Sequence, residues 1–109
     1  MKNHRDIDQR SLAFGRLIAD RVRENPALIG RAKATLERWL SDCSPRARAS
    51  LNEWRTILDG PIEGVLELLI SEDERSTRLR QSNPFAGVLS RGERDAIIRR
   101  FHNHDTQAA

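Results

Sequence analysis

The fold class follows from the stretch LIGRAKATLERWLSDC, residues 28–43. Its apolar residues recur at spacings of one, three, four, three, one and three, which places them on one face of an α-helix. Pro26 lies just before the stretch, where a proline suits the first turn of a helix. The pattern therefore predicts an amphipathic helix whose apolar face needs a partner within the same fold. The residues on this face are Leu28, Ile29, Ala32, Leu36, Trp39, Leu40 and Cys43.

Helix signals continue directly after this stretch. Ser44-Pro45 predicts the start of a further helix, and Asp59-Gly60 predicts its end. Pro61 then starts the next helix, in which residues 62–70 are apolar on most sides. A helix of that composition is expected at the centre of the core.

Further helix starts are predicted nearer the two ends of the chain. Ser11 can cap a short helix in the N-terminal part. Ser71 with Glu74, and Ser90 with Glu93, have the spacing of a capping box, in which the serine and the acidic residue each bond the other's backbone. The sequence therefore places helices on both sides of the central apolar one.

No segment shows the alternation of a β-strand, so the predicted fold is all-α, a single compact bundle of about five to six short helices. We expect the helical domain over residues 11–101, a flexible N-terminus over 1–10 and a flexible C-terminal tail over 102–109. Gly15 and Gly64 fall inside helical segments, where glycine is unfavourable, and this predicts close helix packing at both positions.

Composition limits the class of protein. The chain has 109 residues and a mean hydropathy of −0.65, which fits one folded domain. It has no apolar run near 18 residues, so no membrane span is expected. The first residues lack the apolar region of a signal peptide, and Cys43 is alone and cannot form an internal disulfide; both features favour a cytoplasmic protein.

The charges are separated along the chain. Residues 1–52 carry eleven Lys or Arg against six Asp or Glu, residues 53–74 one Arg against seven acidic residues, and residues 75–109 seven Arg against three. This dipolar pattern suits a protein partner as well as DNA, and the acidic block weakens the case for non-specific nucleic-acid binding. A specific DNA contact stays open, because residues 27–58 have the order helix, short turn, helix, with Arg46 and Arg48 at the start of the second helix.

The sequence contains no constellation of residues that predicts catalysis. His102, His104 and Asp105 have poor spacing for a shared metal ion, and no cysteine assists them. Glu63 and Glu67 lie one helical turn apart but lack a second kind of titrating group for acid–base chemistry. No glycine-rich phosphate loop is present. We therefore expect a protein that is not an enzyme and has no metal and no cofactor.

The irregular segment Leu79–Leu89 carries an aromatic residue between two helical patterns. Asn83-Pro84 blocks the continuation of a helix and displays Phe85 on a turn. Two interpretations are open: Phe85 plugs the end of the bundle, or it is an exposed anchor for another chain. In the second interpretation the partner-binding residues are Arg78, Arg80, Gln81, Pro84 and Phe85, because aromatic and arginine residues are enriched at interface hot spots.

The same segment carries a family resemblance, together with the stretch before it. The run EWRTILDGPIEGVLELLISEDERSTRLRQSNPFAGVLSRGER is similar to a family of small all-helical bacterial proteins that share a W-x-x-I/L-L-D-G-P stretch and an L-R-Q-S-x-P-F-A-G-V-L signature, with a match over residues 11–101. Many members look like the antitoxin half of toxin–antitoxin gene pairs. The positions that carry the resemblance are Trp54, Leu58, Asp59, Gly60, Pro61, Arg80, Gln81, Pro84, Phe85, Ala86, Gly87, Val88 and Leu89.

The resemblance implies an antitoxin that neutralises a cognate toxin by direct binding. The expected mechanism is occlusion, in which the segment from Arg80 to Leu89 docks Phe85 and nearby arginines onto an acidic or nucleotide-binding cleft of the toxin. The alternative is a DNA-binding transcriptional regulator acting through Arg46 and Arg48, and the two roles can coexist. Operator DNA and a second copy of the chain are further partners that the sequence leaves open.

Overall fold

The computed structural model describes the backbone of residues 4–108 and the side chains of residues 8–85 and 87–101. Over this range the protein is all-α and has no strand, as predicted. It comprises six α-helices and one short 3₁₀-helix, η1. Their bounds are α1 His4–Glu24, α2 Leu28–Leu40, α3 Pro45–Asp59, α4 Ile62–Ile70, α5 Glu74–Arg80, η1 Ala86–Val88 and α6 Arg91–Ala108.

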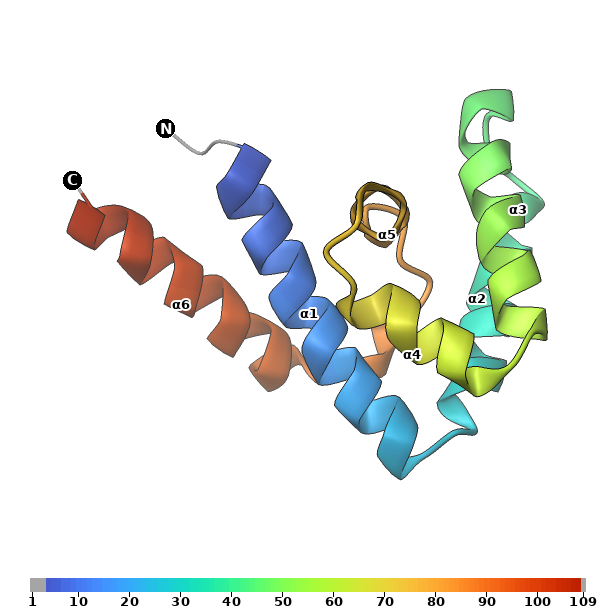
Figure 1. Ribbon diagram of the computed structural model, residues 1–109, viewed down its shortest axis with the longest axis horizontal. Coiled ribbons are helices and arrows are strands. Elements are labelled where there is room, and N and C mark those ends of the chain that lie inside the picture. Colours follow the sequence, from blue (N-terminus) through green and yellow to red (C-terminus); the bar gives the residue numbers. More distant parts are fainter. Residues whose placement is uncertain (1–3, 109) are drawn as a thin grey trace.

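The helices are arranged around α1 and α4. Helix α1 packs against α4, α5 and α6, and Figure 1 shows α6 running alongside it. On the other side of α4, α2 and α3 lie next to each other and run in opposite directions (Figure 1). The short α5 and the segment that follows it join the two halves, because α5 contacts α1 and α4 while η1 contacts α2.

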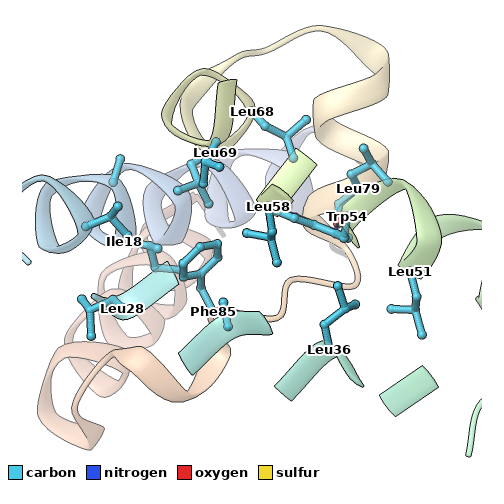
Figure 2. Packing of buried hydrophobic residues seen from close by; sticks show 14 of the residues in the cluster. Ile18, Leu28, Leu36, Leu51, Trp54, Leu58, Leu68, Leu69, Leu79 and Phe85 are labelled. Atoms are coloured by element: carbon cyan, nitrogen blue, oxygen red, sulfur yellow. Dashed lines mark hydrogen bonds between the residues drawn. The ribbon is translucent and has the colours of Figure 1, made fainter. Parts of the chain in front are cut away.

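The core lies where these elements meet. Trp54 of α3 is completely buried, and its indole Nε1 donates a hydrogen bond to Leu79 O at 2.8 Å. Figure 2 shows its ring close to Leu58 and Leu79. Helix α4 contributes the buried Val65, Leu68 and Leu69, which confirms its predicted central position.

Several predicted helix ends are confirmed by their hydrogen bonds. Ser44 caps α3, because its Oγ accepts from Ala47 N at 3.2 Å, and Pro45 occupies the first turn. Ser90 and Glu93 form the predicted capping box: Glu93 N donates to Ser90 Oγ at 3.1 Å, and Ser90 N donates to Glu93 Oε1 at 2.9 Å. These signals involve residues three apart, so the local sequence is sufficient to define them.

Other predicted boundaries were wrong. Asp73, and not Ser71, caps α5, since its carboxylate accepts from Ser76 N at 2.7 Å. Ser71 ends α4 instead, and its hydroxyl bonds Asp73. Helix α1 begins at His4 and runs through Ser11, because no glycine or proline interrupts residues 4–11.

Helical backbone extends into both of the chain ends that are predicted to be flexible. Helix α6 continues past Phe101 to Ala108, since each residue added to a helix completes another backbone hydrogen bond. The flexible ends predicted over 1–10 and 102–109 thus overlap helical backbone on both sides. Residues 1–3 and residue 109, which also belong to that expectation, lie outside the described part of the chain.

The two helical glycines have different surroundings. At Gly15 the backbones of α1 and α4 come so close that a Cβ would meet Leu69 O well inside 3.0 Å, which confirms close packing there. At Gly64 a Cβ would meet nothing within 4 Å, so the expectation of close packing was wrong. Gly64 lies on the exposed side of α4.

Candidate functional site

The segment that follows α5 closes the core and does not display an aromatic anchor. Pro84 and Phe85 are both fully buried, and Phe85 is 0% exposed. Asn83 Oδ1 accepts from Phe85 N at 2.9 Å, which stabilises the turn, and the Phe85 ring meets Trp54 edge-on with 6.2 Å between centroids. Figure 2 shows Phe85 in the middle of the labelled core side chains. Pro84 and Phe85 are therefore not exposed partner contacts, and the prediction that they bind a partner directly was wrong. They are buried because removing the ring and its apolar neighbours from water stabilises the fold.

Arg80 is also committed to the fold, with 5% of its surface exposed. Its Nη1 donates to Leu68 O at 3.0 Å and to Ser71 O at 2.5 Å, and its Nε donates to Ser11 Oγ at 3.3 Å. The carbonyls lie at the C-terminal end of α4, where the helix dipole favours a cation. Burial lowers the pKa of the Arg80 guanidinium, although arginine stays charged near neutral pH. The prediction that Arg80 is a free partner contact was wrong, because its donors bond the chain itself.

The other two predicted partner contacts reach the surface. Arg78 is half exposed, and its guanidinium donates to Glu53 Oε2 at 2.9 Å and to Ser50 Oγ at 3.3 Å. Gln81 is exposed at the end of α5. Arg78 thus ties α5 to α3, and Gln81 is accessible to another molecule.

A cleft opens beside Gln81, and we call it the arginine cleft. It has a volume of about 350 Å³ and is lined by residues of α1, of α2, of the end of α5 with the segment after it, and of the start of α6. Its basic side chains are Arg10, Arg80 and Arg94; its polar side chains are Ser11, Gln81, Ser82 and Asn83; and its apolar side chains are Phe14, Ile18, Trp39 and Leu89.

The described lining of the arginine cleft carries positive charge. Among the lining residues that the structure describes, none is acidic. Arg94 is exposed and Arg10 is half-buried, and neither forms an ion pair with another described side chain. The nearby Glu93 pairs with Arg21 and bonds the backbone of Ser90, and both interactions lower the pKa of its carboxyl group. Glu93 is therefore ionised but already engaged with groups outside the cleft lining.

Sequence reasoning missed this cleft because tertiary packing creates it. Arg10 and Arg94 come from opposite ends of the chain and are brought together by the pairing of α1 with α6. The sequence pattern places Trp39 on the apolar face of its helix. In the structure Trp39 is partly buried and packs against the edge of the core. Four lining residues, Arg80, Gln81, Ser82 and Leu89, belong to the L-R-Q-S-x-P-F-A-G-V-L signature, but the signature does not indicate a cleft.

The predicted DNA-contacting residues lie on another part of the molecule. Arg46 and Arg48 are exposed at the start of α3, next to the α2–α3 connection. The opposite face of α3 is buried through Leu51, Trp54 and Leu58. Helices α2 and α3 run antiparallel side by side (Figure 1), so they form a helical hairpin.

The residues considered for metal binding or catalysis form no site among the described side chains. No group of three or more His, Cys, Asp or Glu within that part of the chain could hold a metal ion. The side chains of His102, His104 and Asp105 lie outside it. Cys43 is half-buried, with its Sγ 3.7 Å from Leu40 O, and Glu63 and Glu67 are exposed.

Comparisons with known proteins give no match: no family model, no curated protein and no solved structure is similar to this chain. Among the described residues, none of the helices combines the length and the apolar character needed to span a bilayer.

Proposed function

We propose that this protein is a non-enzymatic binding protein that recognises an acidic segment of another protein through the arginine cleft. The observation that supports the proposal is the lining of the cleft, which combines three arginines with four apolar side chains and has no carboxylate among its described residues. Arginine and aromatic side chains are the types enriched at interface hot spots. An electropositive cleft of this kind also attracts an acidic partner and accelerates association.

The family resemblance supports a toxin as the partner. In this proposal the antitoxin binds the toxin with Arg10, Arg94 and Gln81 at the centre of the contact, and it neutralises the toxin by covering its surface. Phe85 acts indirectly: it fixes the turn that carries Gln81, Ser82 and Asn83 into the cleft wall. The proposed mechanism is still occlusion of the toxin, but the contacting residues are Arg10, Arg94 and Gln81 in place of the Phe85 anchor that the sequence predicts.

In this proposal the toxin gene lies beside the gene of this protein, and co-expression with the product of that neighbouring gene is the test. Both genes are driven by unrelated inducible promoters, so that any DNA binding by the protein does not affect expression. The cleft variant is Arg10→Glu with Arg94→Glu, and the matched control is Arg46→Glu with Arg48→Glu, which makes the same change in net charge on α3. Thermal melting followed by circular dichroism verifies that both variants fold.

The cleft variant is expected to lose protection against the toxin and to fail in a pull-down of it, because charge reversal places carboxylates against the acidic segment of the toxin. The control is expected to protect as well as the unchanged protein. Equal protection by the two variants would show that the cleft is not the binding surface.

DNA binding through the start of α3 is a second candidate. The observation that favours it is the exposure of Arg38, Arg46 and Arg48 near the α2–α3 connection, where none of the three pairs with a described carboxylate. Binding of the protein's own promoter DNA should weaken with salt and should be lost on Arg46→Ala with Arg48→Ala. A gel shift that is unchanged in this double variant would eliminate this role for α3.

A further inference from the structure

The arginine cleft has two chemically distinct parts. One part is apolar: Ile18 and Leu89 are buried, and the rings of Phe14 and Trp39 are partly buried. Its rim is basic, with Arg94 exposed on α6 and Arg10 half-buried on α1. A ligand that uses the whole cleft must therefore present an apolar group and a negative charge close together.

We propose that the arginine cleft binds an anchor of two neighbouring side chains in a partner protein, one apolar and inserted between Phe14 and Trp39, the other a carboxylate held by Arg10 and Arg94. This inference rests on the proposed function for the use of the cleft by a protein partner, and it adds the chemistry of the segment that binds. The size of the cleft agrees with it, because about 350 Å³ lies at the lower end of the range for ligand pockets and suits a pair of side chains.

Neither part of the cleft is sufficient alone. An ion pair between exposed side chains contributes little in water, so a carboxylate or phosphate held only by Arg94 binds weakly. An apolar group inserted alone leaves the basic rim without a counter-charge. Arg80 adds positive charge behind the rim, but its guanidinium bonds Leu68 O and Ser71 O and is largely occupied. Affinity therefore requires both groups in one segment.

The chain contains its own reporter for binding. It has two tryptophans, so an ¹⁵N-labelled sample gives two indole N–H signals. Trp39 lines the cleft, whereas Trp54 is completely buried and donates its indole N–H to Leu79 O. A ligand in the cleft should move the Trp39 signal and leave the Trp54 signal in place.

The test is a titration of the full chain with four probes, followed by nuclear magnetic resonance. The first probe is the capped dipeptide acetyl-Phe-Asp-amide, which carries both groups. Acetyl-Phe-Asn-amide lacks the charge at the same size, acetyl-Gly-Asp-amide lacks the apolar side chain, and inorganic phosphate tests a simple anion site. The first probe should shift the Trp39 signal with an affinity about tenfold above that of each of the others.

Two single substitutions complete the test. Arg94→Gln should weaken binding of acetyl-Phe-Asp-amide by about tenfold, because it removes a charged donor, whereas Arg48→Gln on α3 should leave binding unchanged. Both residues are exposed, so neither change disturbs the core.

Several outcomes would overturn the inference. Absence of a Trp39 shift with the first probe would remove the anchor site. Equal binding of phosphate or acetyl-Gly-Asp-amide would show an anion site only, and equal binding of acetyl-Phe-Asn-amide would show an apolar pocket only.

The titration and the co-expression test together separate the inference from the proposed function. If the dipeptide binds as expected but the cleft variant still neutralises the toxin, the anchor site stands and the proposed function falls. If the dipeptide does not bind but the cleft variant loses neutralisation, the proposed function stands and the anchor inference falls.

Discussion

Replacement of Gly15 by alanine should destabilise the protein, although alanine is the better helix former. Gly15 lies in α1, where the helix meets the end of α4. An added Cβ would lie well under 3.0 Å from Leu69 O and 3.1 Å from both Leu69 C and Arg80 Cδ. The nearest obstacle is backbone, so a change of side-chain rotamer cannot relieve the clash. Helices α1 and α4 must move apart.

The size of the effect follows from two opposing contributions. In a helix, alanine is favoured over glycine by about 1 kcal/mol. Overpacking a closely packed core costs about 1–3 kcal/mol, and the upper part of that range applies where backbone must move. Separating α1 from α4 also disturbs the bonds of Arg80 to Leu68 O and Ser71 O. We therefore expect a net loss of about 1–2 kcal/mol, or about 5–15 °C in melting temperature for a domain of this size.

Gly64→Ala is the matched control, since this glycine is also helical but has nothing within 4 Å of the added Cβ. Here only the helix preference acts, and we expect a gain of about 0.5–1 kcal/mol. Urea unfolding followed by circular dichroism measures both variants against the unchanged protein. If Gly15→Ala is as stable as Gly64→Ala, the close approach of α1 to α4 does not exist in solution and the reasoning fails.

Three further predictions concern the core, a helix cap and acid stability. Phe85→Ala should lose about 3–5 kcal/mol in urea unfolding, since it empties the centre of the core, and Phe85→Leu should lose less; full stability of the alanine variant would contradict burial of the ring. Ser44→Ala should lose about 1 kcal/mol with an unchanged m-value, because it removes the cap of α3. The bonds from Ser90 N and Arg21 lower the pKa of Glu93 in the folded state, so the stability that Glu93 contributes is present above its unfolded pKa and is lost as the pH falls through its folded pKa. Glu93→Gln keeps a capping side chain but removes the charge, so its melting temperature should fall less between pH 7 and pH 3 than that of the unchanged protein. Parallel pH profiles of the two proteins would show that this carboxylate is not involved.

Local sequence was sufficient for the helices and for several of their ends. The cap at Ser44 and the capping box of Ser90 with Glu93 depend on neighbours within one turn, so residue type and spacing predict them. The spacing of Ser71 and Glu74 also predicts a capping box, but Ser71 does not cap α5. Asp73 does so, because it lies closer to the start of α5 and its carboxylate is the stronger acceptor for a helix N-terminus. Where two caps compete, spacing alone does not decide between them.

The arginine cleft could not be predicted from the local sequence. The arginine cleft exists because α6 returns alongside α1 and brings Arg94 near Arg10, and no periodicity reports that pairing. Phe85 illustrates the converse problem. A turn with an aromatic residue is compatible with an anchor or with a core plug, and its 0% exposure here results from contacts with Trp54 and other residues distant in sequence.

The buried state of Arg80 determines how the function has to be tested. Arg80 belongs to the sequence signature and also lines the arginine cleft. Loss of activity in an Arg80 variant would therefore be read as evidence that Arg80 contacts the partner. Its removal would leave Leu68 O and Ser71 O without their donor at the end of α4, and an unsatisfied buried carbonyl costs about 1–3 kcal/mol. A loss of function at Arg80 would therefore report damage to the fold as readily as damage to an interface. Arg10 and Arg94 lie on the rim of the same cleft without such bonds among the described side chains, and changes there separate binding from stability.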